Sequence, residues 1–302
     1  MAKKSKFQII AEYLALRVVF GGIAILPRRA AHAAGVALGS LAYRLLKKQR
    51  SRGIRNLEIA FPEMSAAERE RVIHGTFRTF GRMFSVLAKV RSMTAANIGK
   101  YVDTDPSILL NPSRGTIVIS PHLGSPDLMV IALYYSTRRP MALVAREMDN
   151  PLIDRYLTEG REWCGHKVVT KRNIGRIVPK LLSDNGAVAM LPDVNSSLER
   201  GVFVPFFGIP ACTPTGTATL ALRSNAVILP VWCVWDRKTA KYRVAAGKPI
   251  EPIRTGDHKQ DIIETTAAYN LELEKLIRTY PDRYLWTHRR WKTRPPGEPE
   301  LY

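Results

Sequence analysis

The 302-residue chain has only three cysteines, Cys164, Cys212 and Cys233, and no CxxC pair. An odd count without such a pair excludes a disulfide framework, and a chain of this length folds without covalent staples. We therefore expect reduced thiols that fill the core of a protein in the cytoplasm. The histidines and acids form no cluster at metal-ligand spacing, so we expect no bound metal and no cofactor.

Negative charge is also scarce, with 26 acidic residues against 46 basic ones and a net charge of +20. Such an excess implies a polyanionic partner. The first 56 residues contain twelve Lys or Arg but one acid, Glu12, and these cations flank apolar stretches. That pattern fits lipid headgroups better than a nucleic-acid groove, and no nucleic-acid motif is present. We predict an anionic membrane as partner and no nucleic acid, although the charge alone leaves a nucleic-acid-binding protein as an alternative.

The sequence lacks a long uncharged run in its first part. Val18–Pro27 has ten uncharged residues, about half of the roughly 20 that a membrane-spanning helix needs. A second apolar run, Ala30–Tyr43, follows two arginines. A cleaved leader is the alternative, because Ala31-His32-Ala33 resembles a cleavage site. We expect a retained hairpin or in-plane anchor instead, which divides the chain into a membrane-anchoring helical segment, 1–56, and a catalytic domain, 57–302.

A helix is predicted to begin after the anchor, because Ser65 and Glu68 form a capping box. Apolar side chains then recur at three- and four-residue spacing, namely Ile73, Phe77, Phe80, Phe84 and Leu87. Burial of this face in the core is one interpretation. The alternative is that its aromatic rings line a groove for an acyl chain.

From Thr116 onward, short apolar runs alternate with helical segments, which indicates an α/β domain with a mixed, largely parallel sheet flanked by helices. The predicted strands are Thr116–Ser120, Ala142–Ala145, Ala187–Leu191 and Ala226–Trp235. The predicted helices are Pro126–Ser136, Ile174–Leu182 and Pro214–Arg223. The Pro-rich end, Arg294–Tyr302, is expected to be a loose tail.

Polar residues follow three of these strands: His122, Arg146 and Asp193. Ligands of open α/β sheets bind beyond the carboxyl ends of the strands, so we expect the three to share one crevice. Ser125 and Pro126 open the next helix, which places Asp127 in its first turn. We expect Asp127 to accept the Nδ1 proton of His122, leaving Nε2 to take a proton from a hydroxyl. The alternative is a core histidine beside an acid that complements the helix dipole.

A His followed by an acid five positions later, after a short strand, resembles the signature of glycerolipid and lysophospholipid acyltransferases. More specifically, the chain resembles the lipid A lauroyl and myristoyl transferases and their mannoside-acylating relatives, over nearly its whole length. The blocks that carry this resemblance stand in the family's order. They are Asn56-Leu57 with Phe61-Pro62-Glu63, Leu191-Pro192-Asp193, Gly201–Gly208 (GVFVPFFG) and Pro281–Lys292 (PDRYLWTHRRWK).

The resemblance implies acyl transfer from acyl-carrier protein or acyl-CoA to a hydroxyl of a lipid A precursor or related glycolipid, at the cytoplasmic face of the inner membrane. His122 and Asp127 would be catalytic; Arg161, Asp193 and Arg146 would bind substrate. Arg161 would hold a phosphate or stabilise developing negative charge, and Asp193 would orient acceptor hydroxyls or Arg161. Lipid A enzymes usually carry Glu where this chain has Asp127, so a lysophospholipid or mannoside acceptor stays open.

Several features have two interpretations. The segment Phe206–Thr217 would supply backbone donors at a helix start or bury an irregular strand connection. Trp286–Trp291, a basic and aromatic cluster that includes His288, would lie at the membrane interface or pack as a C-terminal helix. A serine hydrolase that uses Ser120 or Ser125 lacks the GxSxG turn. A non-catalytic membrane protein of the same fold is a further alternative.

Overall fold

A computed structural model describes residues 4–108, 113–139, 141–170 and 172–302. Its centre is a seven-stranded sheet in the order β1-β9-β8-β2-β5-β3-β4, in which β8 and β9 pair antiparallel and the other neighbours pair parallel. The predicted fold class is therefore confirmed. The sheet strands are β1 (Val102–Thr104), β2 (Thr116–Ile119), β3 (Met141–Val144), β4 (Lys167–Val169), β5 (Ala187–Met190), β8 (Val227–Asp236) and β9 (Lys241–Ala246).

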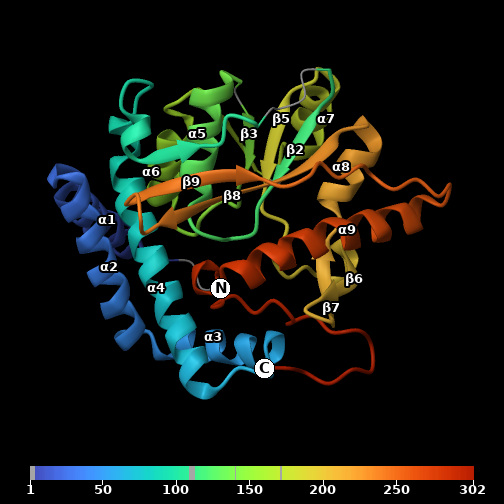
Figure 1. Cartoon of the computed structure of the whole chain (residues 1–302), viewed down its shortest axis with the longest axis horizontal. Coiled ribbons are helices and arrows are strands. Elements are labelled where there is room, and N and C mark those ends of the chain that lie inside the picture. Colours follow the sequence, from blue (N-terminus) through green and yellow to red (C-terminus); the bar gives the residue numbers. More distant parts are fainter. Residues whose placement is uncertain (1–3, 109–112, 140, 171) are drawn as a thin grey trace.

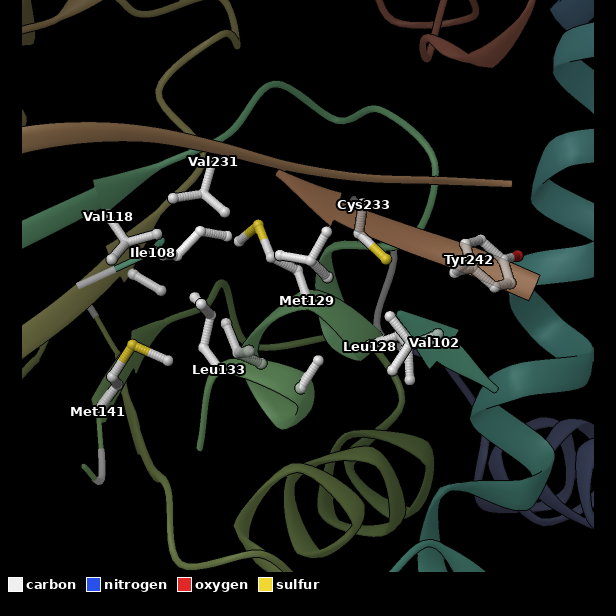
Figure 2. Close-up of a cluster of buried hydrophobic side chains, with 14 of the residues drawn as sticks. Val102, Ile108, Val118, Leu128, Met129, Leu133, Met141, Val231, Cys233 and Tyr242 are labelled. Atoms are coloured by element: carbon white, nitrogen blue, oxygen red, sulfur yellow. The ribbon is translucent and has the colours of Figure 1, made fainter. Parts of the chain in front are cut away.

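Helices cover both faces of the sheet (Figure 1). One face is covered by α5 (Pro126–Thr137), and α6 (Pro151–Glu162) contacts β4; the other face is covered by α7 (Ile174–Ser183), α8 (Gly216–Ser224) and α9 (His258–Thr279). Successive side chains of β2 pack alternately into the hydrophobic cores on the two faces of the sheet, because side chains of a strand alternate between faces. Val118 packs with Leu128 and Leu133 of α5 (Figure 2), whereas its neighbours Ile117 and Ile119 pack on the opposite side.

The four predicted strands are β2, β3, β5 and β8, each displaced by at most one residue, and the three predicted helices are α5, α7 and α8. The segment Phe206–Thr217 is not an irregular connection, and it leads into the start of α8 at Gly216, so backbone donors at that helix start stay a prediction. The run after β5 folds as an antiparallel hairpin of β6 (Gly201–Phe206) and β7 (Ile209–Pro214). The sequence pattern does not predict this hairpin, because Pro205 and Pro210 lie within its strands and proline is rare in strands.

The N-terminal segment is a helical hairpin of α1 (Lys6–Ile25) and α2 (Arg28–Leu45) packed on the long helix α4 (Ala66–Lys89), as Figure 1 shows. The two helices have the predicted hairpin form, whereas the retention of this segment and its role as a membrane anchor stay predictions. The predicted capping box of Ser65 and Glu68 begins α4. Glycines let α2 and α4 touch along their backbones. A Cβ on Gly81 would lie 2.1 Å from the Gly35 carbonyl oxygen, so a larger residue would separate the two helices.

By length and composition α1 could cross a membrane, yet both of its ends are bonded to the catalytic domain. Asn150 Nδ2, at the start of α6, donates to the Ile9 carbonyl over 2.9 Å, and Lys89 Nζ of α4 donates to the Ala24 carbonyl over 2.7 Å. The helix is longer than the uncharged run in the sequence because Glu12 and Arg17 lie within it. It is therefore held along the side of the domain at both ends.

The C-terminal end returns to α3 (Lys47–Ala60), beside which Figure 1 places the C-terminus. Tyr302 Oη donates to Asn56 Oδ1 over 2.5 Å, and Arg55 Nε donates to the Leu301 carbonyl over 2.8 Å. The expectation of a loose tail is wrong, because these hydrogen bonds hold the final residues. The predicted domain boundary after residue 56 falls inside α3.

In the basic and aromatic cluster Trp286–Trp291, the side chains of Trp286, Arg290 and Trp291 are buried, the others are half-buried, and the segment is not helical. A 3-10 turn, Pro281–Arg283, precedes it. Arg290 is 2% exposed, with its guanidinium 4.9 Å from the centre of the Phe206 ring and a 3.0 Å hydrogen bond to the Cys212 carbonyl. The expected cation–π packing is confirmed, whereas the expected helix and the membrane-interface position are wrong, because these side chains tie the β6–β7 hairpin to the domain.

Candidate active site

His122 lies in a tight turn that follows β2. The turn requires glycine at Gly124, which has a φ of +65°, and a Cβ there would lie 2.0 Å from the Cys233 carbonyl oxygen. The next residue, Ser125, donates its backbone N–H to the same carbonyl over 2.9 Å. The His122 turn therefore packs directly against β8. Helix α5 begins right after it, with Pro126 in the first turn of the helix.

A C-terminal segment, residues 283–293, holds the other side of this turn; we call it the strap. The Leu285 N–H donates to the His122 carbonyl over 3.0 Å, and the Gly124 N–H donates to the Arg283 carbonyl over 2.9 Å. Leu123 and Tyr284 form an antiparallel bridge between these two bonds. The main chain of His122 is therefore fixed by a segment that lies about 160 residues further along the sequence.

Asp193 is the partner of His122. His122 Nδ1 lies 2.8 Å from Asp193 Oδ1, and the backbone N–H of His122 donates to Asp193 Oδ2 over 2.9 Å. The two residues meet because β2 and β5 are parallel neighbours, so their carboxyl ends lie at one edge of the sheet. The prediction that Asp127 accepts the Nδ1 proton is wrong, because both oxygens of the buried Asp193 already bind the His122 residue.

Asp127 instead pairs with Arg161. Arg161 Nε of α6 donates to Asp127 Oδ1 over 2.7 Å, and the two side chains are 26% and 16% exposed. The contact excludes a fully solvated arginine, and it also excludes Asp193 as the residue that orients Arg161. Asp127 still lies close enough to His122 for its charge to act on the imidazole.

The charges around His122 favour its protonated form. Desolvation alone would lower the pKa of His122, but the charge and hydrogen bond of Asp193, with a smaller contribution from Asp127, outweigh it and raise that pKa above its ordinary value. Desolvation opposes the ionised form of Asp193 as well, yet the charge and hydrogen bonds of His122 lower the pKa of its carboxyl group. Asp193 is thus held as an anion beside a strengthened base.

The second ring nitrogen of His122 is free. Nε2 has no hydrogen-bond partner within the ranges that the structure describes, and the side chain is 30% exposed. With Nδ1–H donated to Asp193, Nε2 carries the lone pair. The arrangement can take a proton from a hydroxyl group that approaches from the open side.

Arg146 is not joined to this pair. It follows β3 and is exposed, and among the described residues it has no hydrogen bond or ion pair. Two of the three predicted strand-end residues are therefore brought together. A substrate-binding role for Arg146 stays a prediction.

His288 of the strap was not assigned to the site from the sequence. Its Nε2 accepts the Asn195 N–H over 2.9 Å, two residues after Asp193. Burial, together with the positive charges of His122 and Arg290, outweighs the negative charge of Asp193 and lowers the pKa of His288 to about 4. It is a neutral acceptor that fixes the Asp193 loop, and only its place in a family block could have pointed to it.

Ser120 and Ser125 are buried, and their hydroxyl groups have no hydrogen-bond partner in the described part of the chain. A nucleophilic serine must lie within hydrogen-bond reach of its base. Neither serine is bonded to His122, so the geometry gives no support to a serine hydrolase.

An apolar cavity of about 550 Å³ lies between the hairpin and α4. Its walls include Ala15 and Leu16 of α1, and the rings of Phe77, Phe80 and Phe84 of α4. The predicted burial of this face is confirmed for Ile73 and Phe77, which are core residues, and all three phenylalanines line the cavity. Use of the cavity by an acyl chain stays a prediction. Leu285 also lines the cavity, and its N–H binds the His122 carbonyl, so the cavity extends to the strap beside His122.

Comparisons with known proteins match nearly the whole chain. A family model described as bacterial lipid A biosynthesis acyltransferase matches residues 1–293. The lipid A biosynthesis palmitoleoyltransferase of Escherichia coli is 31% identical over 276 residues, which covers 89% of this chain and 87% of that protein. The lauroyltransferase of the same organism is 30% identical over 286 residues, 92% of this chain and 90% of that protein.

Among solved structures, the 1-acyl-sn-glycerophosphate acyltransferase of Thermotoga maritima matches 82% of this chain and 96% of its own, with a TM-score of 0.37 and 16% sequence identity. The whole-chain family match and the two transferases carry the assignment. The chain belongs to the bacterial lipid A biosynthesis acyltransferase family and is an acyltransferase.

Proposed function

We propose that the chain transfers a fatty acyl group from a thioester carrier to a hydroxyl group of a lipid A precursor or related glycolipid, with His122 as general base. The observation that supports this most is the state of the imidazole. Asp193 binds Nδ1, Nε2 has no partner among the described residues, and Leu285, whose N–H binds the His122 carbonyl, lines the apolar cavity. In this proposal Asp193, rather than Asp127, orients the base.

The reaction needs one proton transfer in each direction. Nε2 of His122 takes the proton of the acceptor hydroxyl while its oxygen attacks the thioester carbonyl carbon, and a C–O bond forms. The tetrahedral intermediate then expels the thiolate as the C–S bond breaks, and His122 returns the proton to sulfur. Neither an acyl-enzyme nor a metal is required, because a thioester is already activated.

Arg161 is the proposed electrostatic partner of the substrate. It uses Nε for Asp127, which leaves its Nη donors for a phosphate of the acceptor or for the oxyanion of the intermediate. Asp127 holds the guanidinium in place. Its shorter side chain, where lipid A enzymes usually have Glu, favours a lysophospholipid or mannoside as the second candidate acceptor.

Replacing His122 by Asn removes the base but keeps a hydrogen-bond donor at the position of Nδ1, next to Asp193. We expect kcat to fall by roughly 10³-fold or more, because general-base catalysis contributes about 10²–10⁴-fold, while the melting temperature changes little. The assay uses labelled acyl-carrier protein and acyl-CoA as alternative donors, with lipid A precursor and lysophospholipid as competing acceptors. Substantial turnover by the variant would contradict the assignment, and the preferred pair of substrates in the unaltered protein decides donor and acceptor.

The apolar cavity is the proposed site of the acyl chain. Its volume lies within the range of small-molecule pockets, roughly 300–1,000 Å³, and its walls are almost wholly apolar. A chain bound there would run between α1 and α4, with its carboxyl end toward the strap and His122. The α1–α2 hairpin would then complete the substrate site.

Ala15→Phe places a ring in the cavity from α1. We expect the longest accepted donor to lose kcat/KM by roughly tenfold or more for each methylene that no longer fits, while shorter donors keep theirs. Val18→Phe is the matched control, because Val18 is 74% exposed on the same helix and does not line the cavity. Equal effects of both variants, or an unchanged chain-length profile in Ala15→Phe, would remove the cavity from the substrate site.

The hairpin also supports a place on the cytoplasmic face of the inner membrane. Phe7, Ile25 and Leu45 are among its apolar side chains exposed to solvent, and Arg28, Arg29, Lys47 and Lys48 lie at the helix ends, where cations meet headgroups. We propose that α1 lies in the membrane plane. Asn150 and Lys89 bind α1 at points about 22 Å apart along its axis. If α1 crossed the membrane, Lys89 or Asn150 would have to lie in the hydrocarbon layer, where polar side chains are costly.

Flotation with vesicles of anionic phospholipid tests this placement. The double variant Phe7→Ser with Ile25→Ser should reduce partitioning by roughly tenfold or more, since each exposed side chain would otherwise be buried in lipid. Leu271→Ser, at an exposed site on α9, should leave partitioning unchanged. Equal binding of the double variant and the unaltered protein, or stronger binding to nucleic acid at the same salt, would rule the proposal out.

A further inference from the structure

Asn56 of α3 is a buried amide whose hydrogen bonds are all made to the C-terminal part of the chain. Its Nδ2 donates to the Trp286 carbonyl over 2.5 Å and to the His288 carbonyl over 2.6 Å. Its Oδ1 accepts from Tyr302 Oη over 2.5 Å, and the residue is 1% exposed. Both amide hydrogens and the carbonyl oxygen are therefore used.

The two carbonyls that Asn56 binds belong to the strap, which touches both halves of the catalytic pair. Between them in the chain, the strap has no helix or strand to hold it. On one side, Leu285 N–H binds the His122 carbonyl. On the other side, His288 Nε2 binds the N–H of Asn195, two residues from Asp193.

We propose that Asn56 is a positioning residue for the reaction. By fixing the strap at residues 286 and 288, it sets the separation between the His122 turn and the Asp193 loop, and so the hydrogen bond from Nδ1 to Asp193. Asn56 does not touch the reacting atoms. It acts through two backbone carbonyls that flank the contact with His122.

The chemistry of this position requires an amide. The Trp286 and His288 carbonyls lie outside regular secondary structure and are buried or part-buried, so they need donors. Only Asn or Gln brings two donors and one acceptor on an uncharged side chain. Aspartate has the same shape but turns the paired donors into acceptors. A substitution at Asn56 therefore frees the strap without changing the volume of the site.

The test is Asn56→Asp, measured at a temperature where the protein is folded. We expect kcat to fall by on the order of 10²-fold, the cost of misplacing a catalytic group by about 1 Å, with KM for the donor nearly unchanged. Because His122 acts in its neutral form, activity falls as the pH drops through its pKa. A weaker bond to Asp193 lowers that pKa, so the acid limb of the kcat profile should move to lower pH.

Asn270→Asp is the matched control. Asn270 is also a fully buried asparagine, and its Nδ2 donates to the Pro205 carbonyl of β6 over 2.8 Å rather than to a carbonyl of the strap. The variant should lose a comparable amount of melting temperature but keep kcat within about threefold, because in the described part of the chain Asn270 has no hydrogen bond to the strap, to His122 or to the Asp193 loop. The inference is overturned if both variants lose kcat alike, or if Asn56→Asp keeps the original rate and pH profile.

Tyr302→Phe covers the case in which Asn56→Asp does not fold. Tyr302→Phe removes only the hydrogen bond to Asn56 Oδ1, so kcat should fall less than in Asn56→Asp. The acid limb of the kcat profile should again move to lower pH, and an unchanged limb overturns the proposal. The inference rests on the proposed base role of His122. The two fail separately, because absent transfer by the unaltered protein contradicts the proposed function alone.

Discussion

The pair of hydrogen bonds between Asp193 and His122 is the constraint on which the rest of the site depends. One bond fixes the imidazole through Nδ1, and the other fixes the main chain of the same residue. A buried carboxylate is costly unless it is paired and hydrogen-bonded. Asp193 meets both conditions only when the His122 turn lies in one position. Three features hold the turn there: the parallel pairing of β2 with β5, the glycine at Gly124 and the strap.

The second carboxylate has a separate task. Asp127 holds Arg161 over 2.7 Å and acts on His122 through its charge rather than through a hydrogen bond. The site thus contains an anion that orients the base and an anion that orients a cation. A change in the length of the carboxylate side chain at position 127 would therefore act on Arg161 and leave the hydrogen bond between His122 and Asp193 in place.

Much of the fold could be predicted from the sequence, because buried parallel strands are apolar runs bounded by turn residues. His122 and Asp193 could be placed at neighbouring strand ends for the same reason. The hydrogen bond between His122 and Asp193 could not be predicted. Asp127 is five residues from His122 and Asp193 is 71 residues away, and only the strand order brings the distant acid closer. Nearness along the chain favoured the wrong partner.

The strap could not be predicted either. Its residues are rich in charge and aromatic rings, a composition that equally suits a membrane interface, and their burial depends on contacts with α3 and the β6–β7 hairpin. The return of Tyr302 to Asn56 joins positions 246 residues apart. Local patterns carry no information on such a contact, whereas the family blocks that include Asn56 and Trp286 mark the segments that meet.

The most direct measurement is a titration of the His122 ring by NMR with nitrogen-15 label, in the unaltered protein and in Asp193→Asn and Asp127→Asn. We expect the pKa of His122 to lie above the ordinary value of a histidine. That pKa should fall clearly in Asp193→Asn, with loss of the hydrogen-bonded Nδ1 proton signal, and fall less in Asp127→Asn, with the signal retained. Loss of the signal in Asp127→Asn, with an unchanged titration in Asp193→Asn, would contradict this expectation.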